Sequence, residues 1–335
     1  TRAASIQPST SDQQTESSRS FPVTCWNGMR ARLKTFAISG TGQAAQWASH
    51  SPVIAVRSPR AQVDKRRYRE WMTARLASVD AIEWVVGEVL NLVVEDGGVV
   101  GVALSDGRCI RCRSIVLTTG TFLNGLIHVG EERRAAGRLG EAPSVGLSQS
   151  LRDLGFELGR LKTGTPPRLD RRSIDFVAAT ARGNFVEQPG DEPAVPFSFM
   201  TDRVAGPQIS CHLLHTTPLV HDLVRRNIGL SPLYNGQIEA IGPRYCPSIE
   251  DKVMRFPDRE RHHLVLEPEG QSADEIYLNG FSMSLPVDVQ HEMVHALPGL
   301  EHARFLRPAY AIEYDFVLPT QLKATLEAKH VKGLY

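Results

Sequence analysis

Apolar and polar residues alternate between positions 92 and 113, which predicts a three-stranded antiparallel meander. Asp-Gly pairs at 96–97 and 106–107 separate the apolar runs, and such pairs are a strong hairpin signal. The expected strands are Leu92–Glu95, Val99–Leu104 and Cys109–Arg113. We therefore expect this stretch to form a small sheet through local turns.

A short buried strand is predicted at Ile115–Leu117, directly after the meander. It ends in Thr118-Thr119-Gly120, and a glycine at the carboxyl end of a strand lets a bulky ligand approach the backbone. A meander followed by such a strand is typical of flavoproteins that bind two dinucleotides. The pattern favours an α/β fold with a nucleotide near Gly120, and the alternative is a plain strand and turn.

Helical spacing predicts a helix that starts at Ser58-Pro59, because serine is a good cap and proline suits the first helical position. Its apolar face would carry Tyr68, Trp71, Met72 and Leu76. Its other face is basic, with Arg60, Lys65, Arg66, Arg67, Arg69 and Arg75. That face either contacts nucleic-acid phosphates or is a solvated charged surface.

Two further helices are expected. Ser144 would cap a helix that carries Leu147 and Leu151 and ends at Gly155. As a helix start, Ser144 would also place backbone N–H groups against a phosphate, although most capping serines only cap. Thr217-Pro218 would open the second helix.

A second domain is expected to begin near residue 170, where the pattern changes to short strands and loops. Gly159–Asp170, just before it, is interpreted as a basic turn that is rich in glycine and proline. Near the end of the chain, apolar residues alternate as in a half-buried strand. These residues are Tyr310, Ile312, Tyr314 and Phe316.

Composition describes an ordinary globular chain of 335 residues, 41% hydrophobic and 22% charged, with room for about two domains. The net charge of +1 excludes a global basic field, so any nucleic-acid contact must come from local clusters. Five cysteines form no disulfide framework, and no apolar run is long enough for a membrane span. Residues 1–50 are rich in Ser, Thr and Gln and are expected to be atypical and disordered.

Three patterns suggest other chemistry and are weaker. His291-Glu-Met-Val-His295 matches the HExxH zinc signature, but a helical projection places both histidines opposite the apolar residues Val289 and Met293. Cys211, His212, His215 and His221 could also suggest a metal site, but Cys211 and His212 are neighbours that would point to opposite faces of a strand. Gly40–Ala45 matches a dinucleotide fingerprint, but Pro52 and Pro59 interrupt the βαβ unit that must follow. We expect no metal site.

Gly242–Phe256 is chemically the richest stretch. It brings a thiol, several bases, two adjacent acids and an aromatic ring into 15 residues. Cys246 lies near Arg244 and Lys252, and neighbouring cations favour the nucleophilic thiolate. The alternative from composition alone is a salt-bridged loop with an inert thiol.

This stretch resembles, almost residue for residue, the signature of the MnmG/GidA family of tRNA uridine 5-carboxymethylaminomethyl modification enzymes. The likeness is collinear over about residues 52–335. It includes Arg57–Gln62, Val116–Leu123, Gly159–Arg168, Pro196–Met200, Ser231–Tyr234, Leu266–Gly270, Ser284–Pro286, Asp288–Gln290 and Arg307–Asp315.

The resemblance implies a mixed α/β fold, namely an FAD/NAD(P)-binding Rossmann-like flavoprotein with a β-meander and an inserted second α/β domain. Residues 51–165 would form a partial FAD-binding domain with a basic helical insert, and 166–320 the inserted NAD-binding domain. Residues 321–335 would return to the FAD domain, which is expected to be incomplete. The chain begins with Thr, and we expect that it lacks the family's glycine-rich FAD fingerprint and its helical C-terminal domain.

The resemblance also implies site residues. Contacts to FAD would come from Val89, Thr118, Thr119, Gly120, Thr121 and Ser144. The nicotinamide-binding segment would comprise Gly242, Pro243, Arg244, Tyr245, Cys246, Pro247, Ser248, Ile249, Glu250, Asp251, Lys252, Val253, Met254, Arg255 and Phe256. Cys246 would be the catalytic nucleophile. We expect its loop and the strand end at Gly120 to face one shared cleft.

The function implied is FAD- and NADH-dependent addition of a carboxymethylaminomethyl group at C5 of the tRNA wobble uridine. An MnmE-type GTPase partner, a homodimer and a cytoplasmic location (mitochondrial in a eukaryote) would accompany it, with no membrane contact. Arg60, Lys65, Arg66, Arg67 and Arg69 would contact tRNA. The alternatives are an inactive fragment that binds only tRNA or a partner, a folate-dependent tRNA methyltransferase relative, and a zinc hydrolase.

Overall fold

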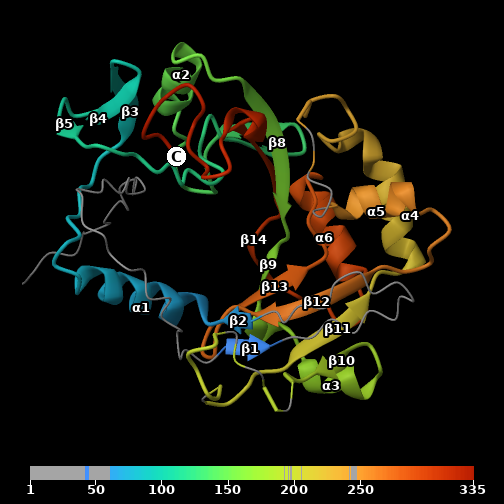
Figure 1. Ribbon diagram of the computed structural model, residues 1–335. Coiled ribbons are helices and arrows are strands. Elements are labelled where there is room, and N and C mark those ends of the chain that lie inside the picture. The colour runs from blue at the N-terminus through green and yellow to red at the C-terminus, as the bar shows by residue number, and fades with distance from the viewer. Residues whose placement is uncertain are drawn as a thin grey trace, which may run out of the picture.

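Four antiparallel sheets organise the described part of the chain (Figure 1). The computed structural model describes residues 42–44, 61–191, 193–194, 196, 198–204, 206–240, 242 and 247–335. The smallest sheet pairs β1 (Gly42–Ala44) with β2 (Ala61–Val63). The Gly40–Ala45 pattern therefore includes a strand at its centre, where a dinucleotide fingerprint needs a turn.

The predicted meander is confirmed as a sheet with the order β3-β4-β5. Its strands are β3 (Val89–Glu95), β4 (Gly98–Leu104) and β5 (Cys109–Arg111). Asp96 and Gly97 both have positive φ, at 50° and 75°, which the tight turn between twisted strands requires. The local turn signals were therefore sufficient to predict this sheet.

The segment after the meander pairs with the far end of the chain. Ile115 donates to the carbonyl of Gly333 at 2.9 Å, and Leu117 donates to that of Tyr335 at 2.7 Å. Leu334 is buried in the same hydrophobic cluster as Ile115. Figure 1 shows the C-terminus beside β3, β4 and the helix α2 (Gly146–Asp153). The predicted strand at 115–117 thus consists of one isolated parallel bridge, made over a long sequence separation.

Another sheet has four strands in the order β7-β6-β15-β8. Its strands are β6 (Leu126–Val129), β7 (Glu132–Ala135), β8 (Leu158–Thr165) and β15 (Tyr310–Val317). The prediction of a turn over Gly159–Asp170 is wrong, because β8 occupies most of it. β8 pairs along its whole length with β15, a strand far away in the sequence that no local pattern could indicate.

The burial pattern of β15 differs from the simple alternation. Glu313 and Asp315 are buried, while Tyr310, Tyr314 and Phe316 are only partly buried. The reason is that β15 lies in the interior of its sheet, between β6 and β8. On its polar face, His128 contacts Glu313 and Arg160 pairs with Asp315, so both carboxylates are covered.

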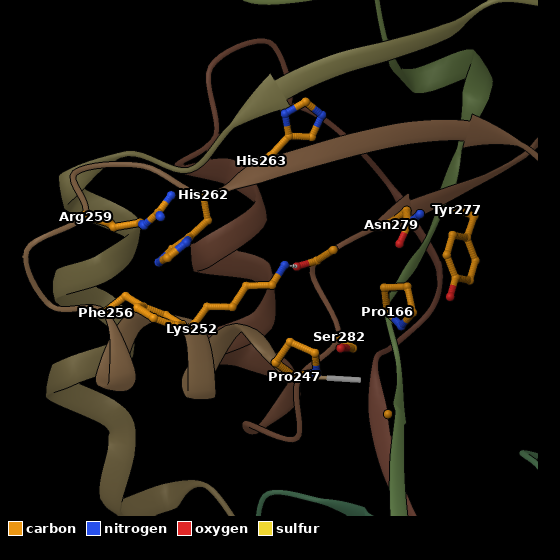
Figure 2. Close-up of a pocket in the computed structure, with 12 residues that line it drawn as sticks. Pro166, Pro247, Lys252, Phe256, Arg259, His262, His263, Tyr277, Asn279 and Ser282 are labelled. Carbon is orange, nitrogen blue, oxygen red and sulfur yellow. Dashed lines mark hydrogen bonds between the residues drawn. The ribbon is translucent and has the colours of Figure 1, made fainter. Parts of the chain in front are cut away.

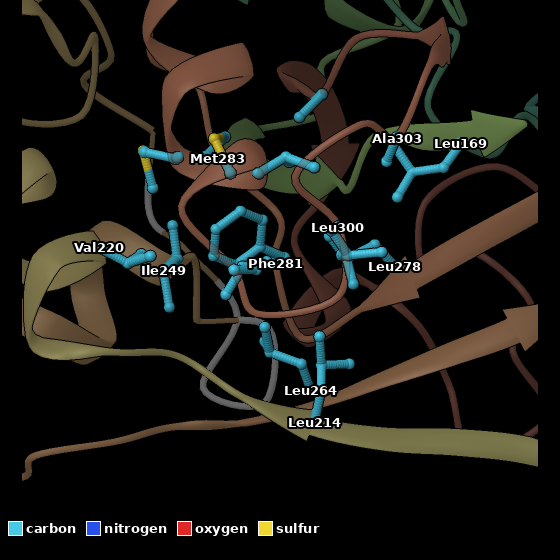
Figure 3. Close-up of a cluster of buried hydrophobic side chains, with 14 of the residues drawn as sticks. Leu169, Leu214, Val220, Ile249, Leu264, Leu278, Phe281, Met283, Leu300 and Ala303 are labelled. Atoms are coloured by element: carbon cyan, nitrogen blue, oxygen red, sulfur yellow. The ribbon is translucent and has the colours of Figure 1, made fainter. Parts of the chain in front are cut away.

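The largest sheet has six strands in the order β10-β11-β12-β13-β9-β14. They are β9 (Arg168–Asp170), β10 (Val186–Gln188), β11 (Cys211–His215), β12 (His263–Pro268), β13 (Glu275–Asn279) and β14 (Phe305–Arg307). One face buries a hydrophobic core in which Leu214 and Leu264 from the strands meet Val220, Ile249 and Phe281 (Figure 3). The opposite face is polar, because it carries residues such as Glu267 and Asn279.

Four helices contribute to this core. They are α3 (Phe176–Ala181), α4 (Pro218–Asn227), α5 (Ile249–Arg255) and α6 (Val287–His295). The predicted start of α4 is confirmed, since the Thr217 side chain accepts from the Val220 N–H. Three 3-10 turns are also described, at Arg171–Ser173, Ile228–Leu230 and Pro319–Gln321.

The basic helix α1 (Lys65–Ala77) begins later than predicted. Ala61–Val63 is a strand, and Asp64 caps the helix by accepting from the Arg67 N–H at 2.9 Å. Ser58 and Pro59 lie outside the described residues. The expected apolar face is not packed into a core, because Tyr68 is 42% and Trp71 37% exposed. The helix therefore presents both its charges and its aromatic rings to solvent.

Candidate functional site

The residues expected to contact FAD lie around the start of α2 (Gly146–Asp153). The Ser144 N–H donates to the carbonyl of Phe122 at 2.8 Å, which ties Ser144 to the turn at 118–121. A Cβ added at Gly146 would lie 2.9 Å from Leu90, the residue after Val89, so the helix start packs closely on β3. We call Val89, Thr118–Thr121 and Ser144 the α2 cluster.

The α2 cluster offers mainly backbone groups. The expectation that Ser144 caps the helix is wrong: the N-cap is Val145, with no side-chain hydrogen bond, and Ser144 forms a bridge with Leu123. The predicted stop at Gly155, with φ of 84°, is confirmed. Gly120 is exposed with φ of 54°, a left-handed conformation that favours glycine. Uncapped N–H groups at a helix start attract anions.

A buried carboxylate holds α2 in place. Asp315 is 2% exposed and accepts from Ser148 at 2.5 Å and from Arg152 and Arg160 at 2.7 Å each. Burial alone would raise the pKa of Asp315, but the hydrogen bonds from these three residues outweigh it, and the pKa is lowered. The charged form of Asp315 therefore fixes α2 against β8 and β15.

A second candidate site is a pocket of about 490 Å³ beside α5, which we call the α5 pocket (Figure 2). Pro247, Lys252 and Phe256 line it from the segment predicted to bind nicotinamide. Arg259, His262 and His263 follow them along the chain. The far wall consists of Tyr277, Asn279, Gly280 and Ser282, with Gly164 and Pro166 from the end of β8 and the next turn.

The α5 pocket is cationic and partly apolar. Lys252 and Arg259 line it, and the lining residues that the structure describes include no carboxylate. His262 is 8% exposed, and its Nε2 has no hydrogen-bond partner among the described residues. Burial, and then the nearby His221, lower the pKa of His262 to about 4, so the ring is neutral at pH 7. The pocket can therefore attract an anion and still form a hydrogen bond with a neutral group.

The helix α5 is anchored to the backbone of residues 280–284. The Ile249 N–H donates to the Ser282 carbonyl at 2.8 Å, and the Lys252 Nζ donates to the Gly280 carbonyl at 2.7 Å. Glu250 is fully buried, and its Oε1 accepts from the Ser284 N–H at 2.8 Å. Ser248 and Asp251 form a capping box that starts the helix.

The predicted nicotinamide segment thus divides into parts. Pro247, Lys252 and Phe256 line the pocket, whereas Ile249 and Val253 belong to the hydrophobic core. Met254 and Arg255 are exposed, and Gly242 is exposed outside the pocket lining. Pro243, Arg244, Tyr245 and Cys246 lie outside the described residues. The catalytic assignment of Cys246 therefore remains a prediction.

One backbone contact connects the two sites. The Gly130 N–H, in the turn after β6, donates at 2.6 Å to the Ser284 carbonyl, whose own N–H is held by Glu250. Gly164 from β8 lines the α5 pocket, but none of residues 118–121 does. The shared cleft remains an expectation, and the described contact shows only that the sites are joined through β6 and residue 284.

The predicted tRNA-contacting residues lie on α1, apart from Arg60, which is outside the described residues. Lys65 forms an ion pair with Glu269 at 2.6 Å, which fixes the start of the helix on the turn after β12. Arg66 forms an exposed ion pair with Glu70 at 3.4 Å. Arg67 and Arg69 are also exposed.

The HExxH histidines on α6 make ordinary structural contacts. His291 stacks on Phe305 with ring centroids 4.0 Å apart, and the Nε2 of His295 is 3.0 Å from the Ala303 carbonyl oxygen. Val289 and Met293 are buried on the other side of the helix, as the projection predicted. In the described part of the chain, no three His, Cys, Asp or Glu residues are placed to hold a metal, and no helix is long and apolar enough to cross a membrane.

The family model described as glucose inhibited division protein A matches residues 37–335. The chain belongs to this family. A relative in Geobacter sulfurreducens is 51% identical over 281 residues, 84% of this chain and 44% of the relative, and is named tRNA uridine 5-carboxymethylaminomethyl modification enzyme MnmG. A relative of the same name in Chlorobium phaeobacteroides is 46% identical over 301 residues, covering 89% of this chain and 48% of its own.

The fold agrees with a solved family structure. Aquifex aeolicus GidA, in its form I crystal, matches with a TM-score of 0.79 and 46% identity over 88% of this chain and 49% of that one. This likeness confirms the predicted class, a mixed α/β flavoprotein fold. The chain spans about half the length of the family members it matches.

From the sequence, only those residues of the α5 pocket that belong to the Gly242–Phe256 segment were predicted. Tyr277 and Asn279 alternate with the buried Ile276 and Leu278, so the polar face of a strand was visible in the sequence. His262 gave no such signal. The lowered pKa of His262 depends on burial and then on His221, and neither can be seen from its neighbours in the chain.

Proposed function

We propose that this chain carries the cofactor-binding part of an enzyme that adds a carboxymethylaminomethyl group at C5 of the tRNA wobble uridine. The enzyme would use FAD and NADH and act with an MnmE-type GTPase. Family membership, with relatives named for this modification, is the observation that carries the proposal. The two candidate sites support it, because each matches a different requirement of a dinucleotide.

FAD would be held at the α2 cluster. The uncapped start of α2 and the left-handed Gly120 suit a phosphate group that approaches the backbone closely. Asp315 would keep the helix start in position through Ser148 and Arg152. When bound, FAD supplies reversible hydride transfer. The residues of this chain supply orientation and anion binding.

NADH would bind in the α5 pocket. Lys252 and Arg259 provide positive charge for its diphosphate, and Phe256 provides an apolar surface for a flat ring. The neutral His262 adds a hydrogen-bonding group whose Nε2 has no partner among the described residues. The 490 Å³ volume lies within the range of small-molecule sites.

Cys246 would act as the nucleophile toward uracil. C5 of uracil is a poor nucleophile until a thiolate adds at C6 and generates an enolate, whose C5 can then attack a one-carbon electrophile. Loss of the C5 proton and expulsion of the thiolate restore the aromatic base and the free cysteine. The family resemblance of the Gly242–Phe256 segment motivates this assignment.

A direct test is to produce the protein in bacteria that lack their own enzyme and to analyse tRNA nucleosides by mass spectrometry. The proposal predicts that 5-carboxymethylaminomethyl uridine reappears with the wild-type chain and not with Cys246→Ser. Cys109→Ser is the matched control, because Cys109 is an exposed cysteine on β5, outside the Gly242–Phe256 segment. If the wild-type chain binds tRNA and restores no modification, the alternative of a binding fragment is the correct one.

The nucleophile can be tested separately with RNA that carries 5-fluorouridine at the wobble position. Thiolate addition followed by attack from C5 leaves a fluorine that cannot depart as a proton would, so the protein–RNA adduct persists. We expect a covalent adduct in wild type and Cys109→Ser and none in Cys246→Ser. An adduct that forms equally in all three proteins would exclude Cys246 as the nucleophile.

A further inference from the structure

The α5 pocket continues into a second pocket on the polar face of the six-stranded sheet. This second pocket, of about 310 Å³, shares Tyr277 and Asn279 with the first. Glu267 lines it from β12, and Glu269, Gln62 and Lys65 line it beyond the sheet. We call it the β13 pocket. Because Tyr277 and Asn279 project from the same face of β13, the two pockets form one groove along this face.

Tyr277 is a rigidly supported aromatic ring in the middle of this groove. The Arg168 guanidinium lies over it, 4.2 Å from the ring centroid. Arg168 is itself held, because it donates to the Pro166 carbonyl at 2.7 Å and to Glu269 at 3.1 Å. Aromatic side chains held in this way are the usual stacking surfaces for nucleobases.

Next to Tyr277, a carboxylate and an amide lie together. Glu267 is 3% exposed, and its Oε1 accepts from the Asn279 Nδ2 at 2.7 Å. Glu267 is also the direct cross-strand partner of Tyr277. Carboxylates commonly accept hydrogen bonds from ribose hydroxyls in dinucleotide sites, so this position suits the sugar of a stacked nucleoside.

The charged groups differ along the groove. Lys252 and Arg259 lie at the α5 end, whereas Glu267 and Glu269 lie at the other, where Lys65 and Arg168 pair with Glu269. His262 at the α5 end adds a buried Nε2 with no partner among the described residues. A nucleoside diphosphate has the same order, with anionic phosphates at one end and a ribose and base at the other. A polynucleotide fits less well, because its phosphates would continue past the two glutamates.

We propose that the groove binds the ADP half of the nicotinamide dinucleotide, with the adenine on Tyr277, the ribose at Glu267 and Asn279, and the diphosphate at Lys252 and Arg259. The nicotinamide half would then extend toward Pro247 and Ser282. This inference rests on the proposed binding of NADH at the α5 pocket and adds the direction in which the dinucleotide lies.

The test is calorimetric binding of ADP, which contains no nicotinamide, to the purified protein. Wild type binds ADP, and ADP displaces NADH. Tyr277→Ala weakens ADP binding about tenfold, as expected for loss of one stacked base, whereas Tyr277→Phe retains it. Arg259→Gln weakens binding of ADP but not of adenosine, because Arg259 is assigned to the phosphates. Thermal unfolding of each variant verifies that it is folded.

Gly120→Val controls for the ADP half of FAD, whose expected position is the α2 cluster, because Gly120 has a φ of 54° that a β-branched residue does not readily adopt. ADP affinity unchanged in this variant supports the groove. ADP affinity that falls in Gly120→Val and not in Tyr277→Ala would overturn the proposal. So would a Tyr277→Ala protein that binds ADP normally but has reduced affinity for an anticodon stem-loop RNA, because the groove would then bind RNA.

The outcome also separates this inference from the proposed function. If NADH binds and ADP does not displace it, the direction assigned here is wrong, while NADH binding stands. If NADH fails to bind at all, the proposed role of the α5 pocket fails, and this inference fails with it.

Discussion

One buried carboxylate on the four-stranded sheet and one beside the six-stranded sheet are surrounded by opposite kinds of partner. Asp315, on the four-stranded sheet, is bonded to Arg152 and Arg160. Glu250, beside the six-stranded sheet, is bonded to Ser231 and Ser284, and no cation pairs with it among the described residues. Both carboxylates are almost inaccessible to solvent. One is compensated by charge and the other by neutral donors.

This difference has a physical consequence. An ion-paired carboxylate contributes through its charge, so a neutral isostere leaves the arginines uncompensated. A carboxylate bonded only to neutral donors contributes through its acceptor oxygen, which an amide also provides. The helix beside each candidate site therefore depends on a different property of a side chain of the same chemical class.

The largest effect is expected from Asp315→Asn. It leaves Arg152 and Arg160 facing a neutral amide, and breaking a buried pair in this way costs about 3 kcal/mol, since both arginines retain some solvent. Urea unfolding monitored by circular dichroism measures the decrease in stability. A change below about 1 kcal/mol would show that the charge of Asp315 is not what holds α2.

The next effect concerns pH. The folded-state pKa of His262, about 4, lies below its ordinary value of 6.5, so folding favours the neutral ring. This stability is fully present above pH 6.5 and is lost as the pH falls through about 4, with up to about 3 kcal/mol involved at 1.4 kcal/mol per pKa unit. Hydrogen exchange should show protection around β12 falling between these values in wild type and much less in His262→Asn.

The same experiment sharpens the comparison. The pKa of Asp315 is lowered from 3.8, so its contribution is present above that pH and is lost only at more acidic values. We therefore expect protection near β12 to decrease before protection near α2 as the pH falls. Simultaneous loss in both places would mean that the two regions are not separately sensitive.

A smaller effect is expected at Glu250. Glu250→Ala leaves the Ser284 N–H buried without its acceptor, which costs about 2 kcal/mol. Glu250→Gln keeps an acceptor oxygen and should cost less than about 1 kcal/mol. Parallel urea titrations of these variants and of Asp315→Asn provide the contrast. An equal decrease in Glu250→Gln and Asp315→Asn would remove the distinction between the two carboxylates.

No change in stability is expected on α1, whose arginines are exposed. Arg66→Glu with Arg69→Glu should weaken tRNA binding and reduce its dependence on salt, by roughly one unit of logarithmic slope for each phosphate that α1 no longer neutralises. Filter binding at several salt concentrations measures this slope. Arg113→Glu is a matched control, since Arg113 is exposed and lies outside α1. An equal decrease in the control would indicate a general charge effect.

Features that depend on interactions between residues close in the sequence could be predicted, and features that depend on distant residues could not. The meander depends on turns at Asp96-Gly97 and Asp106-Gly107, whose signals lie within a few residues, and it was predicted with nearly correct bounds. β8 and β15 pair with each other, but in the sequence they lie before and after all the strands of the six-stranded sheet. Because its partner is so distant in the chain, β8 was mistaken for a turn. Burial of Asp315 was missed for the same reason, since its partners Arg152 and Arg160 are distant in the sequence.

The candidate sites show the same division. Lys252 and Phe256 were predicted because a family signature contains them, and they line the α5 pocket. Tyr277 was missed because its significance comes from the Arg168 guanidinium above it, across a strand pair. Cys246 lies outside the described residues, so only chemistry can test it.

We propose that flavin and nicotinamide bind at separate sites, the α2 cluster and the α5 pocket. An anaerobic titration of the flavin-loaded protein with NADH, followed by flavin absorbance, tests this proposal most directly. We expect that NADH bleaches the flavin in wild type, and that Lys252→Ala keeps its flavin but is bleached at least about tenfold more slowly. A Lys252→Ala protein that loses its flavin, or is bleached at the wild-type rate, would contradict the proposal.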